Sequence, residues 1–187
     1  MSDNNYADII VLDILLIGKL SVGKLSMIDR LLDIPFIENE ICLHSGPDKT
    51  IISIDGVKCI LQIHENQPDY CDNFLELAIG IMLIYEIDDK DSFEDIKKCY
   101  YKKIKKLKNK VCMLVGNKLD LESERKVAKN EAEEFANENE LSFLEVSAKD
   151  NINVKEAFMK IAHETFQKRQ EILSTKKSKF LDKCILV

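Results

Sequence analysis

A glycine-containing segment near the N-terminus has the residue types and spacing of a phosphate-binding loop. It follows the pattern G-x-x-x-x-G-K from Gly18 to Lys24 and lies between an apolar segment and the helix-forming residues 25–32. Backbone N–H groups of such a loop surround an anion at a helix N-terminus, and the lysine adds a positive charge near the outer phosphates. The alternative is a strand-to-helix turn with a capping role only. The pattern predicts a phosphate site made of Gly18, Ser21, Val22, Gly23, Lys24, Leu25 and Ser26.

The residue after the lysine departs from this pattern. A Ser or Thr hydroxyl normally binds Mg²⁺ there, whereas this chain has Leu25, which has no oxygen in its side chain. Ser26 is adjacent, but one step along a helix turns a side chain by about 100°, so it is a poor substitute. We therefore assign no metal ligand, and Mg²⁺ binding is in doubt.

A second group of polar residues follows two later apolar segments. Asn117-Lys118-Leu119-Asp120 comes after Val111–Val115, and Ser147-Ala148-Lys149 comes after the strand-like segment 142–146. Ligands of open α/β sheets bind where parallel strands end at their carboxyl edge. One carboxylate that accepts two N–H bonds from guanine discriminates against adenine, which lacks those donors. The order of these motifs after a phosphate loop predicts a site for a guanine nucleotide, GTP or GDP.

The elements that must position these motifs alternate between strands and helices. Continuous apolar runs at 9–17, 79–87 and 111–115 are typical of strands covered on both faces. Two β-rich segments between residues 50 and 63 are joined by Asp55-Gly56, a good hairpin turn. Helical patterns follow, one opening at a cap formed by Ser92 and others at 130–139 and from Asn153. This alternation predicts a doubly wound α/β domain.

Composition places the chain in a broad class. Its 187 residues are 45% hydrophobic and 32% charged, as in a globular protein, and the net charge of -6 argues against a nucleic-acid partner. We find no apolar run of ~18 residues and no basic region ahead of an apolar one near residue 1, so neither a membrane span nor a secretory signal is expected. Six cysteines without a C-x-x-C pair are expected to be reduced, inside the cell.

Taken together, these motifs resemble the Ras superfamily of small GTPases, and its Rab branch most closely. The resemblance covers about residues 8–170 and is strongest over 88–96, 115–121 and 125–162. It implies a small G domain of the P-loop NTPase class over residues 1–170, with a mostly parallel six-stranded sheet flanked by helices and one antiparallel hairpin. It also implies that Asn117 and Asp120 bind guanine, that Lys118 packs along the base and that the Ala148 N–H meets the guanine carbonyl. Ser147 and Lys149 belong to the same motif.

The departures from the family all concern the phosphate end. The first-switch threonine falls on Cys42, and the D-x-x-G motif falls on Glu65 to Pro68, which has no N–H. The residue that would orient the attacking water becomes Asp69. With Leu25, these changes predict weak or absent GTP hydrolysis, so we assign no catalytic residue. The alternatives are a slow GTPase completed by regulatory proteins and an interaction module that binds no nucleotide.

The last residues predict attachment to a membrane. From residue 168 to 183 six basic residues oppose two acidic ones, and the chain ends in Cys184-Ile185-Leu186-Val187, a C-a-a-X box. A prenyl chain on Cys184 binds membranes marginally, and the lysines supply a second signal. The alternative is a chance cysteine in an apolar C-terminus. We expect a basic flexible tail over 171–187, a place on the cytoplasmic face of a membrane, and protein effectors or regulators in vesicle traffic or signalling.

Overall fold

Six strands form one sheet in the computed structural model, which describes residues 9–38, 47–65 and 75–185, with side chains up to residue 175. The strand order is β2-β3-β1-β4-β5-β6. The strands are β1 (Ile10–Ile17), β2 (Asp48–Ile54), β3 (Val57–Glu65), β4 (Gly80–Glu86), β5 (Val111–Asn117) and β6 (Ser142–Glu145). All neighbours pair in parallel except β2 and β3. The predicted α/β class is confirmed.

The single antiparallel pair is the hairpin predicted at Asp55-Gly56. Both turn residues have positive φ, 50° for Asp55 and 80° for Gly56, as a tight two-residue hairpin requires. The hairpin places β2 at the sheet edge and pairs β3 in parallel with β1, so that Glu65 at the end of β3 lies opposite Leu16. The end of β3 is thereby brought to the phosphate loop that follows β1.

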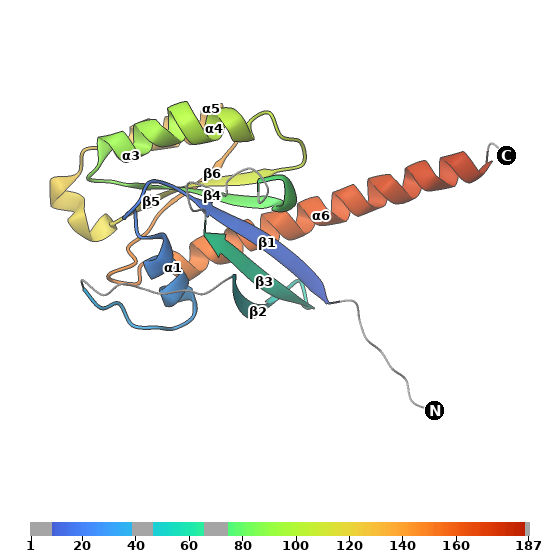
Figure 1. Cartoon of the computed structure of the whole chain (residues 1–187), viewed down its shortest axis with the longest axis horizontal. Coiled ribbons are helices and arrows are strands. Elements are labelled where there is room, and N and C mark those ends of the chain that lie inside the picture. The colour runs from blue at the N-terminus through green and yellow to red at the C-terminus, as the bar shows by residue number, and fades with distance from the viewer. Residues whose placement is uncertain (1–8, 39–46, 66–74, 186–187) are drawn as a thin grey trace.

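Helices cover both faces of the sheet (Figure 1). On one face, α1 (Lys24–Leu31) and α6 (Val154–Ile185) bury Leu12, Ile14 and Leu16 of β1. The opposite face buries Leu15 and Ile17 beneath α3 (Lys90–Asp95) and α5 (Lys129–Glu138). Because successive side chains of a strand point to opposite faces, a continuous apolar run such as β1 supplies both layers.

The helical segment after β4 differs from the prediction in two details. Asp89, not Ser92, caps α3, because its side chain accepts from the backbone N–H of Asp91. Ser92 is fully buried and instead bridges the N–H of Glu86 and the carbonyl of Asp89. The helix then widens into a π-helical segment, η1 (Ile96–Tyr100), before α4 (Tyr101–Ile104). The predicted cap at Ser92 is therefore wrong by one turn.

The last helix extends further than the sequence suggested. We expected a flexible tail from residue 171, whereas α6 runs without a break to Ile185 and projects beyond the sheet (Figure 1). The Arg169 guanidinium still donates to the Val11 carbonyl at 2.9 Å, and Leu173 beyond it is half exposed. The segment contains no glycine or proline, and four of its residues are lysines, which favour helix. Its basic composition therefore does not imply a flexible chain.

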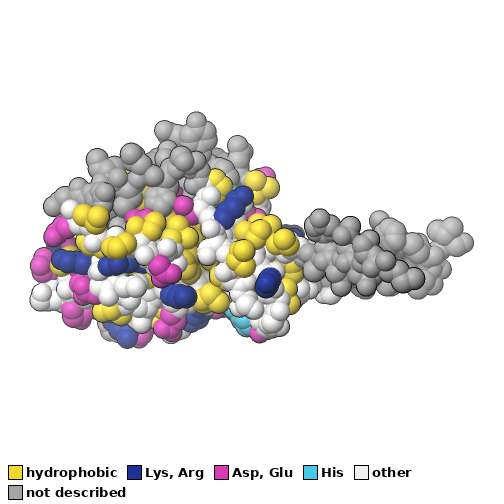
Figure 2. Space-filling view, turned by 90° about the horizontal axis from the view of Figure 1, so that it is seen from below, with side chains coloured by type: hydrophobic (Ala, Val, Ile, Leu, Met, Phe, Trp, Pro, Cys, Tyr) yellow, Lys and Arg dark blue, Asp and Glu magenta, His cyan; other side chains and the backbone are white. Residues whose placement is uncertain are grey.

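The side chains on the face seen from below mix both signs of charge with hydrophobic residues (Figure 2). Acidic and basic side chains are thus interspersed on that face. No described helix has an apolar stretch long enough to cross a lipid bilayer.

Candidate functional site

A pocket of about 460 Å³ lies where three segments of the sheet end, after β1, after β5 and after β6. Its size is that of a small-molecule site. Eight of the predicted residues line it: Ser21, Gly23, Ser26, Asn117, Lys118, Asp120, Ala148 and Lys149. The structure therefore brings the phosphate motif and the base motif, about 100 residues apart in sequence, to one cavity.

Residues behind the pocket and the two glycines of the loop hold its shape. Val22 is buried in the core, and Ser147 is fully buried below the pocket. Gly18 lies so close to β4 that an added Cβ would sit 2.3 Å from the Ile84 carbonyl oxygen. Gly23 has φ of 86°, and an added Cβ there would lie 2.3 Å from Asn117 Nδ2. Both glycines are thus required by the close approach of loop and strand.

Asn117 connects the two halves of the pocket. Its Nδ2 donates to the Val22 carbonyl at 2.8 Å, and its Oδ1 accepts from the Ala148 N–H at 3.2 Å. The side chain is 1% exposed, so leaving either group without a partner would be costly. Asn117 therefore holds the phosphate loop against the segment 147–149.

Asp120 has one carboxylate oxygen engaged within the protein. Ser147 Oγ donates to Asp120 Oδ1 at 2.6 Å and accepts from the Asp150 N–H at 3.0 Å. Asp120 lies in the 3₁₀ segment η2 (Leu119–Glu124), directly after β5, and lines the pocket. The serine thereby orients a carboxylate toward the position where a base with adjacent N–H donors would lie.

Arg30 was not predicted as a site residue, yet it holds the base-side loop. Its Nε donates to the Ala148 carbonyl at 2.8 Å and its Nη2 to the Lys149 carbonyl at 2.7 Å. A planar guanidinium makes two such bonds in a fixed geometry. Helix α1 therefore positions the loop 147–149 through Arg30, a contact that joins residues 118 or more positions apart.

Lys118 follows β5 in the left-handed conformation, with φ of 67°. Its Nζ donates to Glu86 Oε2 at 2.6 Å, at the end of β4. The ion pair anchors the amine, while the residue still lines the pocket. This placement is compatible with the implied packing of the lysine stem along a base.

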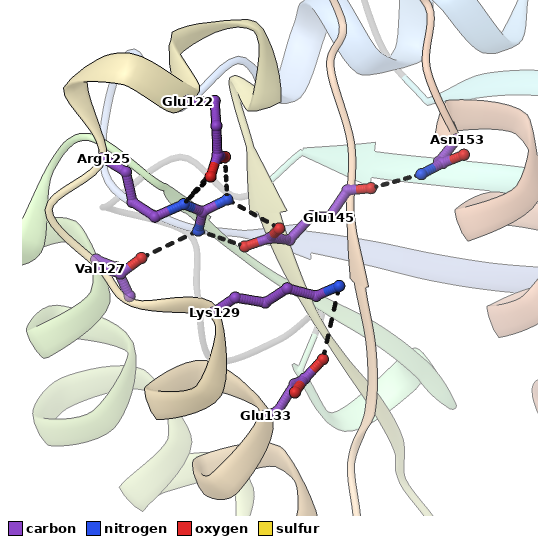
Figure 3. A network of polar contacts seen from close by, with 7 residues as sticks. All are labelled: Glu122, Arg125, Val127, Lys129, Glu133, Glu145 and Asn153. Carbon is purple, nitrogen blue, oxygen red and sulfur yellow. Dashed lines mark hydrogen bonds and ion pairs between the residues drawn. The ribbon is translucent and has the colours of Figure 1, made fainter.

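An ion-pair network supports the base side from below (Figure 3). Arg125 donates from Nη1 and Nη2 to the two carboxylate oxygens of Glu145 at 2.6 and 3.0 Å, and from Nε to Glu122 at 3.0 Å. Hydrogen bonds from Arg125 hold the pKa of Glu122 below its ordinary value. Asn153 donates to the Glu145 carbonyl at 2.9 Å. The network ties β6, and so the loop 147–149, to the segment that carries Asp120.

The phosphate end is organised around Lys24, the first residue of α1. Its side chain is 3% exposed, and its Nζ donates to the carbonyls of Gly18 at 3.2 Å and Lys19 at 3.0 Å. The Glu65 carboxylate lies 3.4 Å from the same ammonium. Leu25, next along the helix, packs against the hydrophobic core. The position after the lysine thus serves packing, not coordination.

Lys19 of the phosphate loop forms an ion pair with Asp89, the cap of α3, at 3.3 Å. The hydrogen bond to Asp89 raises the pKa of Lys19. Partial burial raises the pKa of Asp89, but the bonds from Lys19 and from the N–H of Asp91 outweigh it, so the pKa lies below its ordinary value. The pair fastens the exposed side of the loop to the neighbouring segment.

Four lining residues were missed by sequence reasoning: Leu121 of η2 and, in the segment before β2, Phe36, Ile37 and Glu38. The last three are the more informative. They lie beyond the end of α1, in a segment without regular secondary structure. Phe36 presents an aromatic ring, which can stack on a base. An aromatic residue directly after a proline, in the segment that follows the helix of the phosphate motif, was the available signal.

Several predicted positions lie outside the described residues. They are Cys42, Asn66, Gln67, Pro68 and Asp69, on which the first-switch and D-x-x-G arguments rest. The side chain of Cys184 is also outside the described part, although its backbone belongs to α6. These arguments stay predictions from sequence.

Comparison with known proteins identifies the family. The Ras family model matches residues 13–167. The chain is 35% identical over 168 residues to Ras-related protein Rab-12 from mouse and from human, covering 84% of this chain and 68% of each relative. It is 37% identical over 124 residues to Ras-related protein Rab-10 of Diplobatis ommata, covering 63% of this chain and 62% of that protein. The chain belongs to the Ras family of small GTP-binding proteins, in its Rab branch, which confirms the resemblance.

Proposed function

We propose that this pocket binds a guanine nucleotide through Asp120, Lys118 and the segment 147–149 at the base and through the loop 18–24 at the phosphates. The proposal is supported by the contacts of the base side, where each polar side chain is held by a partner within the protein. Such preorganisation lowers the cost of ordering the site when a ligand binds. GTP and GDP share all the groups that this side would contact.

We further propose that GTP hydrolysis by this chain is weak or absent. The observation that carries this proposal is Leu25, which has no side-chain oxygen and packs against the hydrophobic core at the position where a metal-binding hydroxyl would be needed. Glu65, the other candidate oxygen ligand, is paired with Lys24. Among the described residues no group of three His, Cys, Asp or Glu side chains is arranged to hold a metal ion. These residues do not fit a Mg²⁺ site, and we derive no catalytic step through one.

The test is to purify the protein without added nucleotide, denature it and identify what is released by chromatography. Stoichiometric GDP or GTP is the expected result and would support nucleotide binding, and GTP that survives purification would itself indicate that hydrolysis fails. A single-turnover assay then follows the conversion of loaded GTP to GDP. A rate comparable to that of ordinary small GTPases, or turnover stimulated by Mg²⁺ and an activating protein, would favour the slow-GTPase alternative.

An empty protein would point to the third function, an interaction module that binds no nucleotide. This alternative has structural support, because the hydrogen bonds of Asn117, Ser147 and Asp120 join loops of the protein. These side chains would therefore be needed for folding even if no nucleotide were bound. A folded protein whose melting temperature does not respond to GDP would establish it and reject nucleotide binding.

We also propose attachment to the cytoplasmic face of a membrane through a prenyl group on Cys184, with a role in vesicle traffic or signalling through protein effectors. The support is the C-a-a-X pattern and the six basic residues between 168 and 183. Each basic residue near an anionic leaflet contributes about 1 kcal/mol. Cell fractionation of Cys184→Ser against the unaltered chain tests this proposal. Equal membrane partition of the two proteins would reject it.

A further inference from the structure

Lys24 of the phosphate loop has its ammonium group already surrounded by oxygen atoms. The Gly18 and Lys19 carbonyls accept from it at 3.2 and 3.0 Å, and Glu65 Oε1 lies at 3.4 Å. An ammonium has three N–H donors, so the two carbonyls leave one for a further partner. A phosphate oxygen that reaches Lys24 must therefore compete with the Glu65 carboxylate for that position.

The Glu65 carboxylate is held in place by the fold. Glu65 is the last residue of β3 and lies in register with Leu16 of β1, which leads directly into the phosphate loop. Its side chain is only 23% exposed, and that of Lys24 is 3% exposed, so water screens their interaction less than it would at the surface. The carboxylate thus places a negative charge 3.4 Å from the ammonium that, in a loop of this type, binds the outer phosphates.

We infer that Glu65 is a specificity-determining residue. Its carboxylate pairs with Lys24 in place of a phosphate oxygen, so that the pocket binds guanosine diphosphate more tightly than the triphosphate. This inference rests on the proposed binding of a guanine nucleotide and adds which phosphate state is preferred. The lysine of such a loop reaches the β- and γ-phosphates, so a monophosphate does not compete with Glu65. A diphosphate competes in part, and a triphosphate brings the most negative charge next to the carboxylate.

Titration of fluorescent GMP, GDP and GTP into the full-length protein and Glu65→Gln, in buffer with EDTA, tests the inference. EDTA removes divalent cations, so the readout reports the charge on Glu65 alone. We expect Glu65→Gln to bind GTP on the order of ten-fold more tightly, to gain less for GDP and to leave GMP unchanged. Glu133→Gln makes the same change of charge on α5, away from the pocket lining, and is the matched control.

Far-UV circular dichroism and thermal melting confirm that each variant is folded. Should Glu65→Gln fail to fold, Glu65→Asp replaces it, because the shorter side chain keeps the charge but moves it away from Lys24 by one methylene. We then expect smaller gains in affinity, again largest for GTP, less for GDP and none for GMP. No change in the GTP-to-GDP affinity ratio, or an equal gain for GMP, would overturn the inference. So would weaker GTP binding by Glu65→Gln when Mg²⁺ is restored, since that sign belongs to a metal ligand.

The binding measurements distinguish failure of the inference about Glu65 from failure of the proposed nucleotide binding. If the unaltered protein binds guanine nucleotides and the variants bind them identically, only the inference is lost. If the folded protein and Glu65→Gln both bind none of the three nucleotides, the proposed function is rejected and the inference with it. Binding of GTP by Glu65→Gln alone would support both.

Discussion

The base end and the phosphate end of the pocket are built in different ways. At the base end, Asn117 and Ser147 bond to parts of the protein, and Arg30 fixes the backbone of the same loop. At the phosphate end, Lys24 is paired with Glu65, and Leu25 faces the core. The polar side chains of the base end have structural partners, so their replacement would destabilise the fold as well as weaken ligand binding. The hydroxyl missing at residue 25 would serve a metal ion, and Leu25 packs against the core instead.

Because of this difference, the base end and the phosphate end of the pocket are not equally informative about function. A base motif that also supports the fold is expected both in a protein that binds a nucleotide and in one that has lost nucleotide binding. The phosphate loop, whose lysine is paired with Glu65, is where the proposed preference for GDP and the proposed loss of hydrolysis can be tested. The phosphate end is therefore the better place to measure function.

Asp120→Ala tests the base end and has the largest expected effect. The variant loses the carboxylate that would accept from guanine, and it leaves the buried Ser147 hydroxyl without its acceptor. We expect GDP affinity to fall by about 100-fold, measured by fluorescence titration, since bonds to a charged acceptor contribute ~1.5–3 kcal/mol each.

Asp150→Ala is the control for that experiment, because Asp150 lies in the same loop with an exposed side chain and bonds to Ser147 through its backbone N–H. GDP binding that is equal in Asp120→Ala and the unaltered protein would contradict the assignment of Asp120.

Arg30→Ala tests whether α1 positions the base-side loop. Loss of the bonds to the Ala148 and Lys149 carbonyls should weaken GDP binding by about 10-fold and lower the free energy of unfolding by ~1–3 kcal/mol. Arg30→Lys should not restore binding, because a lysine cannot make both bonds with the same geometry.

The GDP dissociation rate separates the positioning role of Arg30 from a purely structural one. A faster dissociation at a temperature where Arg30→Ala is fully folded supports positioning. If only the melting temperature changes, the contact between α1 and the loop serves stability alone.

Leu25→Thr tests whether the phosphate end can be returned to metal-dependent binding. The hydroxyl should make GTP affinity rise several-fold on addition of Mg²⁺, while the rate of hydrolysis stays low because Cys42, Pro68 and Asp69 are unchanged. Leu25→Val has the same shape as the threonine variant without the hydroxyl and controls for lost packing. An equal response of both variants to Mg²⁺ would show that residue 25 is not the missing ligand.

The Lys19–Asp89 pair gives the smallest predicted effect, a dependence of stability on pH. The pKa of Asp89 is lowered, so its contribution is present above its ordinary pKa near 3.8 and is lost as the pH falls through its pKa in the folded state. The pKa of Lys19 is raised from 10.5, so its share is lost only in strong base. Asp89→Asn should lower the melting temperature by no more than about 2 °C at pH 7.

Once the pH falls below the pKa of Asp89 in the folded state, the melting temperatures of Asp89→Asn and the unaltered protein should converge, because Asp89 is then protonated in both states. A difference that persists in acid would show that the effect of Asp89 does not come from its charge.

The strands and the two motifs could be predicted from sequence because each depends on a local pattern. The apolar run of β1, the Asp55-Gly56 turn and the buried stripe of α6 at Ala157, Phe158 and Ile161 all have a short-range physical cause. The cap of α3 and the extent of α6 were missed. Ser92 does not cap α3 because its hydroxyl accepts from the N–H of Glu86 at the end of β4. The helix beyond residue 171 agrees with the helix propensity of its residues, whereas the prediction of a tail relied on their charge.

The set of chemical groups can be identified from the amino-acid sequence alone: a phosphate motif, a base motif, and a leucine where a hydroxyl would bind a metal ion. The tertiary structure alone decided how these groups are paired. Arg30 reaches the loop 147–149, Asn117 joins both halves of the pocket, and Glu65 is brought to Lys24 by the pairing of β3 with β1. Such contacts join residues 31 to 119 positions apart. No local pattern encodes them, because they depend on the order and register of strands that meet only in the folded chain.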